Sequence, residues 1–565
     1  MPVDECTTKR PAEAEAANGV PDAKDAPWWK GATIYQVYPR SFLDTNGDGV
    51  GDLPGIIKGL DHIASLGVDA VWLSPFFTSP MDDYGYDVAD YCDVDPMFGT
   101  LEDFDRLVSR AHELGLKVII DQVYSHTSHE HDWFKQSREN RTNPKADWYV
   151  WADPKADGSP PNNWQSVFGG PSWSWDARRQ QYYFHNFLRE QPQLNVHNPE
   201  VQDALLAAAK FWLDRGVDGF RLDAINFSMH DRQLRDNPPS NMPMEKVTRP
   251  FDLQRHVYNM SQPEVPQFLE RIRALLDTYD GIFTVAEIGG PDPISEMKAF
   301  TEGEKRLNSA YNFDFLYAEK LVPAAVQASL NQWDGGPDEG WPSWAFSNHD
   351  APRAVSRWAS ADERKQAADA LLLLLLGFRG NAFIWQGEEL GLPQAHVPFE
   401  LLKDPEAIAN WPRTLGRDGA RTPIPWKTGA AHAGFTSGDP WLPVDPAHEA
   451  LSVAAQERDP GSSLNVTRSL MKLRQSLPVL RLGRMAFLDA PDGIVAFRRQ
   501  WGNHSLLCVL NCGETPIDYV PEDGAAYRVL ADQTGAVNGF VALPEQIARW
   551  SGYWAIPRDE GSRGA

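Results

Sequence analysis

The stretch LEDFDRLVSRAHELGLKVIIDQVY, residues 101–124, joins an expected helix directly to an expected strand. Apolar side chains recur every three or four residues up to Gly115, and this glycine can cap the C-terminus of a helix. The run KVIIDQVY that follows is apolar and rich in β-branched residues, as in strands that are buried on both faces. We therefore predict an amphipathic helix followed by a strand of a parallel sheet.

The same alternation recurs along most of the chain. A second helical pattern covers residues 201–216, ends in a glycine, and is followed by the strand-like run GFRLDA at 219–224. Other strand-like runs begin at residues 32, 69, 283, 344 and 381, with a weaker one at residue 310. About eight such units favour a closed α/β barrel of the eight-fold (β/α) TIM type over an open sheet.

Two regions interrupt the alternation. Residues 126–195 are rich in Trp, Asn, Gly and Pro, and we expect an irregular domain inserted after the third strand. From residue 484 to residue 565, short β-like runs lie between turn residues, which predicts a C-terminal antiparallel β domain. Residues 28–125 and 196–483 would then form the two parts of the barrel, and residues 1–27 a disordered tail.

Composition limits the classes of partner. The formal net charge of −25 argues against nucleic acid and anionic membranes, because phosphate contacts need clustered Lys and Arg. The four cysteines show no metal-binding or redox spacing. The polar N-terminus lacks the apolar core of a secretion signal, and the longest apolar run, residues 370–378, is too short for a membrane span. We expect a cytoplasmic protein that binds a small molecule and has no membrane partner.

The run GFRLDA places two charges in an apolar strand. Arg221 and Asp223 are two residues apart, so in a strand both side chains point to the same face. A carboxylate beside a guanidinium stays ionised and has its pKa lowered. The pair is therefore either a structural ion pair or the setting of a nucleophilic carboxylate.

Polar and acidic residues follow the ends of several predicted strands: His126, Asp223, Glu287, and the pair His349 and Asp350. In a barrel, the C-terminal ends of the strands converge and carry the active site. Three acidic residues at the ends of three different strands therefore predict an active site that contains several carboxylates.

Four short motifs in this order resemble the α-amylase family of glycoside hydrolases: DQVYSH (121–126), GFRLDA (219–224), VAEI (285–288) and SNHD (347–350). The chain is similar to the oligo-α-glucosidase branch of that family in YGYDV (84–88), QPQLN (191–195) and RDGARTPIPW (417–426). The resemblance extends from residue 28 into the C-terminal domain. It implies a retaining, exo-acting α-glucosidase that hydrolyses short α-glucosides such as maltose, sucrose and small oligosaccharides.

The resemblance also implies roles for individual residues. Asp223 would be the nucleophile that forms a covalent glucosyl intermediate, Glu287 the general acid/base, and Asp350 the carboxylate that grips the sugar and stabilises the transition state. The apolar run FTVA directly precedes Glu287, and burial there is expected to raise the pKa of Glu287. Arg221 is expected to keep Asp223 ionised. The residues implied to hold the same glucose ring are Asp83 and Arg417 at its far edge, His126, Arg221 and His349 at its hydroxyls, Tyr86 stacked beneath it, and Phe168 at the pocket mouth.

Three positions depart from the family pattern. Ser125 stands where an asparagine usually helps to bind calcium in true amylases, which argues against that calcium site. Gln193 replaces a common aspartate, which argues against a strict oligo-1,6-glucosidase. Ala224 resembles members that act on α-1,4 bonds, whereas valine at this position is similar to α-1,6-cleaving members.

The loop DTNGDGVGD, residues 44–52, has the spacing of an EF-hand ligand set. Gly55 stands where the bidentate glutamate of that motif would be. We expect a structural Ca²⁺ or Mg²⁺ site at the surface, and the alternative is an Asx-rich turn without an ion. No organic cofactor is expected. The expected ligands are Asp44, Asn46, Asp48, the Val50 carbonyl and Asp52.

Other functions compete with hydrolysis. A transglucosylase or sucrose isomerase would use the same intermediate, with a sugar hydroxyl in place of water. An inactive binding or transporter-associated relative is a different class, but such relatives carry a membrane anchor and lack the carboxylates present here. A calcium-binding protein would rest on residues 44–52 alone. The sequence leaves the linkage preference and the oligomeric state, monomer or dimer, open.

Overall fold

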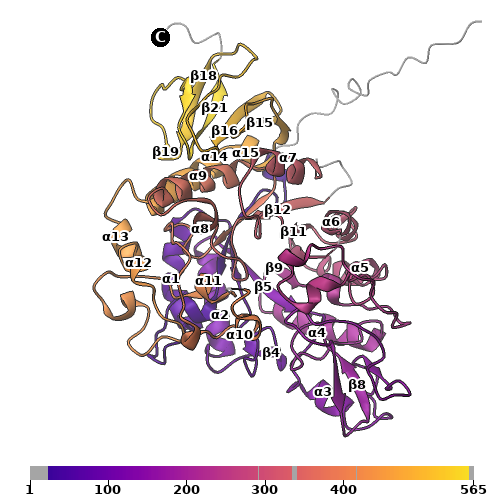
Figure 1. Ribbon diagram of the computed structural model, residues 1–565. Helices are drawn as coiled ribbons and strands as arrows, with labels where there is room; N and C mark the ends of the chain where they lie inside the picture. Colours follow the sequence, from indigo (N-terminus) through magenta and orange to yellow (C-terminus); the bar gives the residue numbers. More distant parts are fainter. Residues whose placement is uncertain (1–22, 291, 334–339, 415, 559–565) are drawn as a thin grey trace, which may run out of the picture.

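The structure is a computed structural model that describes residues 23–290, 292–333, 340–414 and 416–558 (Figure 1). Most of the predicted N-terminal tail lies outside these residues. Within it, η1 (Ala23–Asp25) is a single turn of 3₁₀ helix.

Eight parallel strands form a closed barrel in which neighbouring strands follow chain order and the last strand pairs with the first. The predicted barrel is confirmed, including its weaker strand near residue 310. The strands are β1 (Thr33–Val37), β2 (Ala70–Leu73), β5 (Lys117–Val123), β9 (Gly219–Asp223), β10 (Phe283–Ile288), β11 (Ser309–Asn312), β12 (Trp341–Ala345) and β13 (Asn381–Trp385).

The barrel strands are buried on both faces, which explains their continuous apolar runs. Inward side chains such as Trp72, Phe283 and Phe383 form one apolar cluster inside the barrel. Outward side chains pack against the surrounding helices. The main helices are α1 (Leu53–Ser65), α2 (Leu101–Glu113), α4 (Pro199–Leu213), α5 (Val265–Leu276), α6 (Pro293–Thr301), α7 (Pro323–Asn331), α9 (Arg364–Gly377) and α14 (Ser463–Ser476).

Local sequence sets several of these boundaries. A capping box between Thr100 and Asp103 begins α2. Asn198 caps α4 through the N–H of Glu200. The leucine run of α9 is buried all round, because the helix packs against α14 and against strands of the C-terminal sheet. None of the helices in these ranges is both long enough and apolar enough to cross a bilayer.

The region between β5 and α4 departs from the barrel pattern, as expected (Figure 1). It contains α3 (Asp132–Ser137) and a small antiparallel sheet in the order β6 (Trp151–Ala152), β8 (Gln181–Phe184), β7 (Trp173–Asp176). Trp164, Trp173 and Phe184 form its apolar centre. The inserted region therefore has a small sheet and an apolar cluster, on which Leu234 and Tyr258 of a later connection also pack.

The predicted C-terminal antiparallel β domain is confirmed and lies beyond α9 and α14 from the barrel (Figure 1). Cys508 lies in this domain, and it is a free thiol, as are Cys92 and Cys512. The six-stranded sheet has the order β14 (Arg484–Phe487), β15 (Ile494–Trp501), β16 (His504–Asn511), β21 (Ser551–Pro557), β18 (Tyr527–Asp532), β19 (Gly535–Ala536).

Candidate active site

A cavity of about 530 Å³ opens at the C-terminal ends of the barrel strands. Barrel strand ends, the inserted domain and two long connections, residues 228–264 and 386–417, contribute to its lining. Eight of the ten residues predicted to act on or bind the sugar line this cavity: Asp83, Tyr86, His126, Phe168, Asp223, Glu287, Asp350 and Arg417. The other two, Arg221 and His349, are buried and contact residues that line it.

Arg221 connects the carboxylates at the base of the cavity. Its Nη1 lies 2.6 Å from Asp223 Oδ1 and 2.6 Å from Asp121 Oδ1, and its Nη2 lies 2.6 Å from Glu287 Oε1. Arg221 was predicted to contact sugar hydroxyls. It is instead completely buried, and its charge is compensated by these three carboxylates.

Burial dominates the ionisation of two of these groups. It raises the pKa of Asp223 to about 7, despite the opposing effect of Arg221. The predicted lowering of this pKa was therefore wrong, because the loss of solvation outweighs one neighbouring guanidinium. Burial also raises the pKa of Glu287 to about 7, the direction expected. Two such groups on one guanidinium titrate as a pair, so near neutral pH the pair holds about one proton.

Asp350 has a different environment. It lies 2.9 Å from Arg421 Nη2, 3.5 Å from Arg417 Nη1 and 3.2 Å from His349 Nε2. Burial opposes ionisation, but the guanidinium groups of Arg421 and Arg417 lower the pKa of Asp350, which stays ionised. The three carboxyl groups therefore differ, because the pKa values of Asp223 and Glu287 are raised whereas the pKa of Asp350 is lowered.

His349 is packed beneath Tyr86. The two rings are nearly parallel, at 9° with centroids 5.3 Å apart, and the Tyr86 hydroxyl lies 2.6 Å from His349 Nε2. Gln36 Nε2 lies 2.9 Å from His349 Nδ1. Burial lowers the pKa of His349 well below its usual value, so the ring is neutral at physiological pH.

A connected group of charged residues lies at the inner end of the cavity. Arg417 Nη2 lies 2.8 Å from Asp83 Oδ1 and 2.8 Å from Asp404 Oδ1. The guanidinium carbon of Arg417 is also 5.1 Å from the centre of the Phe168 ring, so Phe168 packs on the cation. Gln191 Nε2 bonds Asp83 Oδ2 at 3.2 Å and lies 3.1 Å from His126 Nε2. Asp83, His126, Phe168 and Arg417 therefore belong to one connected group.

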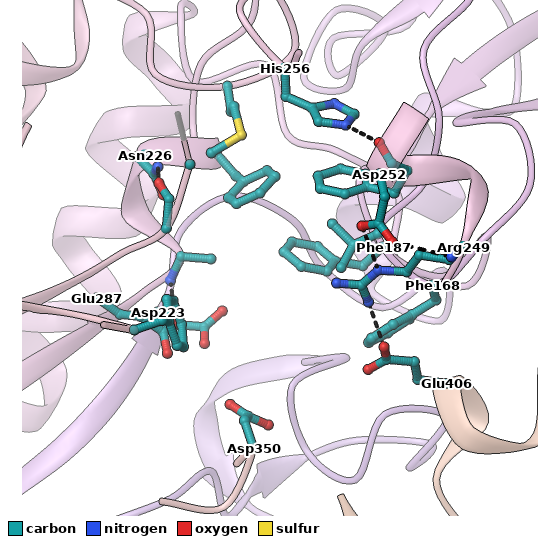
Figure 2. A pocket seen from close by; sticks show the side chains of 18 of the residues that line it. Phe168, Phe187, Asp223, Asn226, Arg249, Asp252, His256, Glu287, Asp350 and Glu406 are labelled. Carbon is teal, nitrogen blue, oxygen red and sulfur yellow. Dashed lines mark hydrogen bonds and ion pairs between the residues drawn. The ribbon is translucent and has the colours of Figure 1, made fainter. Parts of the chain in front are cut away.

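Residues that the sequence analysis did not single out form the outer half of the cavity. Figure 2 shows Arg249, Asp252 and Glu406 across the cavity from Asp223 and Glu287. Arg249 Nη1 lies 2.5 Å from Glu406 Oε1. These residues lie in long irregular connections, where no periodic pattern marks a side chain that faces a cavity. Apolar liners that were also missed are Val167, Phe187, Phe227, Phe251, Met260 and Tyr317.

Comparison with known proteins agrees with this geometry. The family described as "Alpha amylase, catalytic domain" matches residues 36–483, most of the chain. The chain belongs to the alpha-amylase family. It is a glycoside hydrolase of that family, and the resemblance found in its motifs is confirmed.

Three similar proteins illustrate the range of this alpha-amylase group. A Rhizobium meliloti (strain 1021) protein described as "Probable alpha-glucosidase" is 50% identical over 497 residues, covering 87% of this chain and 90% of that protein. The crystal structure of the alpha-glucosyl transfer enzyme XgtA is 49% identical with a TM-score of 0.89, covering 94% of this chain and 100% of that one. A variant of the isomaltulose synthase from Erwinia rhapontici NX5, solved with sucrose, is 33% identical with a TM-score of 0.86, covering 95% and 100%. These similarities support action on α-glucosides.

Each of the three residues that depart from the alpha-amylase pattern forms a hydrogen-bond contact within the protein. Ser125 Oγ lies 2.9 Å from His126 Nδ1. Gln193 donates to the Phe227 carbonyl at 2.7 Å and accepts from Asn186 Nδ2 at 3.0 Å, so it ties the inserted domain to the turn after Asp223. Ala224 adopts a left-handed conformation (φ 38°, ψ 42°) and donates its N–H to Glu287 Oε2 at 3.2 Å.

The predicted ion-binding loop is held by its own hydrogen bonds. Asp44 accepts from the N–H groups of Asn46, Gly47 and Gly49 and from the Thr436 hydroxyl. Asp52 caps α1 by accepting from Gly55 N–H.

The oxygen atoms of this loop fit a hard cation only in part, because several of them already accept hydrogen bonds within the loop. Asn46 Oδ1 accepts from Asp48 N–H, and Asp48 Oδ1 accepts from Val50 N–H, as in Asx turns. Across the described ranges, no group of three or more His, Cys, Asp or Glu is arranged to hold a metal. A cation here remains a prediction from the sequence.

Proposed function

We propose that the chain is a retaining, exo-acting α-glucosidase that hydrolyses short α-glucosides such as maltose, sucrose and small oligosaccharides. The main support is that Asp223 and Glu287 contact the two terminal nitrogens of the same guanidinium, that of Arg221. Retaining glycosidases need their two carboxyl groups about 5–5.5 Å apart, without room for a water between acid and base. A shared guanidinium is consistent with this short spacing.

In the first step, an oxygen of ionised Asp223 bonds to the anomeric carbon of the glucosyl residue. The bond from that carbon to the glycosidic oxygen breaks, and Glu287 transfers its proton to this oxygen, so the alcohol leaves. The negative charge of Asp350 stabilises the positive charge that develops on the ring. The raised pKa of Glu287 keeps a proton available for this step near neutral pH.

In the second step, Glu287 removes a proton from a water whose oxygen bonds to the anomeric carbon, and the bond to Asp223 breaks. The Asp223 ester carries no charge, so the electrostatic effect that raises the pKa of Glu287 is smaller in the intermediate. Glu287 can therefore act as the base.

Exo action is supported by the charged group at the inner end of the cavity. Asp83, Arg417 and Asp404 form a continuous charged group there, and Phe168 packs on it. A terminal glucosyl residue can contact this group through its hydroxyls, whereas the interior of a glucan would need an exit on the far side.

A transglucosylase or sucrose isomerase remains the alternative, because the glucosyl transfer enzyme and the isomaltulose synthase have similar structures. Incubation with maltose, isomaltose, sucrose and trehalose, with products separated by chromatography, distinguishes these activities. Hydrolysis predicts free glucose as the main product, and proton NMR should detect the α anomer first. Release of β-glucose first would exclude retention, and isomerised or lengthened sugars as main products would favour the alternative.

We also propose a structural Ca²⁺ or Mg²⁺ at residues 44–52, held by Asp44, Asn46, Asp48, the Val50 carbonyl and Asp52. Its support is the oxygen spacing of the sequence. No chemical step passes through it.

A further inference from the structure

Tyr311 lies beside Glu287 but outside the cavity. It is on β11, directly opposite Glu287 on β10 in the register of these two parallel strands, so both side chains point to the inside of the barrel. The Tyr311 side chain is buried, and its ring centre lies 5.7 Å from that of Phe383. Glu287 lines the cavity, whereas Tyr311 does not. Tyr311 can therefore affect catalysis only through the groups that it contacts.

The Tyr311 hydroxyl connects Arg221 to Glu287. Arg221 Nε donates to the hydroxyl oxygen at 3.2 Å, and the hydroxyl donates to Glu287 Oε1, also at 3.2 Å. A guanidinium has donors and no acceptor, so the hydroxyl oxygen must accept from Arg221 and its proton is available to Glu287. Within the described part of the chain, Glu287 Oε1 is the acceptor that this proton has.

The two carboxyl oxygens of Glu287 therefore have different surroundings. Oε1 accepts from Tyr311 and lies 2.6 Å from Arg221 Nη2. Oε2 accepts from the backbone N–H of Ala224 at 3.2 Å. A proton bound to Oε1 would face two donors, whereas a proton bound to Oε2 leaves both contacts of Oε1 in place. The transferable proton of Glu287 is therefore favoured on Oε2.

We propose that Tyr311 is a positioning residue that keeps Oε1 of Glu287 an acceptor, so that Oε2 exchanges the proton with substrate and water. This inference rests on the proposed function, because it assumes that Glu287 is the acid/base. In the first step, the proton on Oε2 passes to the glycosidic oxygen as the bond from that oxygen to the anomeric carbon breaks. In the second step, a proton of the attacking water passes to Oε2. Tyr311 keeps its own proton throughout.

Donation from Tyr311 also favours the ionised form of Glu287. A hydrogen bond to the charged form of a carboxyl group lowers its pKa, and it opposes the effect of burial on Glu287. Burial raises the pKa of Tyr311 well above its usual value, so the hydroxyl remains a donor through the neutral range. The other ionisable groups that act on Glu287 or are acted on by it are Asp121, Arg221, Asp223, Tyr317 and Asp350.

Tyr311→Phe removes the hydroxyl and leaves those other groups in place. The pKa of Glu287 should rise, so the basic limb of the kcat/KM profile for maltose should move up by about half a pH unit to one pH unit. The second step needs ionised Glu287. Hydrolysis of the glucosyl intermediate formed from α-glucosyl fluoride should therefore slow by about three- to tenfold on the acid side, and the loss should shrink as the pH rises.

The fluoride also separates the two chemical steps. Its departure needs no acid, so kcat/KM for α-glucosyl fluoride should stay within about twofold in Tyr311→Phe. Rapid quenching followed by mass spectrometry of the intact protein measures formation and loss of the intermediate. A loss of kcat/KM that is equal for maltose and the fluoride, with unmoved pH limbs, would contradict the proposed role.

Replacement of Tyr311 by 3-fluorotyrosine tests the same contact in the opposite direction. The fluorinated hydroxyl is more acidic and donates more strongly, so the basic limb for maltose should move to lower pH. A merely structural role for Tyr311 does not give opposite shifts in the two variants. The fluorinated side chain also keeps its hydroxyl, so this test stands even if Tyr311→Phe does not fold.

Tyr149→Phe is the matched control. Tyr149 is also buried, its hydroxyl lies 2.7 Å from Thr127 Oγ1, and it does not line the cavity. This variant loses one buried hydrogen bond and should leave both pH limbs in place. An unmoved limb with 3-fluorotyrosine, or shifts in the same direction in both Tyr311 variants, would overturn the proposal. If the unmodified protein hydrolyses neither maltose nor α-glucosyl fluoride, the proposed function fails instead.

Discussion

Arg249 and Glu406 form an ion pair, with Nη1 and Oε1 2.5 Å apart, although 157 residues separate them in the chain. Arg249 precedes η5 (Pro250–Leu253), and Glu406 lies in α10 (Pro405–Asn410). Both side chains are about four-fifths buried. The pair therefore joins two irregular connections into one outer wall of the cavity (Figure 2).

Arg249→Ala should loosen this wall and admit longer substrates. We expect kcat/KM for maltoheptaose, relative to maltose, to rise severalfold, and the melting temperature to fall by a few degrees because Glu406 loses its partner. Arg235→Ala is the matched control, since Arg235 pairs with Asp231 at the surface. An unchanged dependence on chain length would show that the pair does not limit substrate size.

Asp223→Asn should abolish turnover while preserving the fold. Covalent catalysis needs the carboxylate, so we expect kcat to fall by at least about 10⁴-fold. The amide oxygen can still accept from Arg221, so the melting temperature should change little. Circular dichroism and glucose release measure the two effects. A purified variant with a tenth of the original activity would exclude Asp223 as the nucleophile.

Glu287→Gln should separate the two chemical steps. A good leaving group needs no acid, so α-glucosyl fluoride should still glucosylate Asp223, whereas removal of the glucosyl group lacks its base. Mass spectrometry of the intact protein should detect one added hexosyl unit, and azide should restore turnover by attacking the intermediate. Absence of an adduct, with both steps lost, would contradict the assigned role.

The raised pKa values predict a defined pH dependence of stability. Between about pH 4 and pH 7, folded Asp223 and Glu287 hold more protons than they do in the unfolded chain, so their contribution to stability falls as the pH rises through this window. Glu287→Gln is neutral at every pH. Its melting temperature, relative to that of the unmodified protein, should therefore increase from pH 5 to pH 8. A constant or decreasing difference in melting temperature would show that folding does not raise the pKa of Glu287.

Removal of divalent cations tests the loop at residues 44–52. If a cation is bound, EDTA should lower the melting temperature by several degrees, and either Ca²⁺ or Mg²⁺ should restore it. Asp48→Ala should abolish this response, and elemental analysis should count one ion per chain before treatment. If EDTA has no effect and no ion is counted, the loop is an Asx turn held by its own hydrogen bonds.

The barrel could be predicted because each strand and helix carries its own local signal. Even the weaker strand-like run near residue 310 could be recognised, and it is β11. Carboxylates at strand ends also follow from local sequence, because the barrel brings all such ends to one edge.

The ionisation of the site could not be predicted locally. The run GFRLDA shows Arg221 beside Asp223, but burial of this pair depends on every surrounding strand, and burial reverses the expected shift of the pKa. Arg421, which lies 2.9 Å from Asp350, belongs to the run RDGARTPIPW, where nothing in the local sequence indicates this contact. Arg249 and Glu406 lie in connections where only the folded chain defines the contact.

The contact of Asp83 with Arg417 has a consequence for biosynthesis. Asp83 leaves the ribosome early, whereas Arg417 is made only after β13, the last barrel strand, has been synthesised. Until then, the buried carboxylate of Asp83 lacks one of its cationic partners, and Asp350 lacks both Arg417 and Arg421. A nascent chain that ends after β13 therefore contains all eight barrel strands but not the complete glucose site, so activity should begin only when translation has passed residue 421.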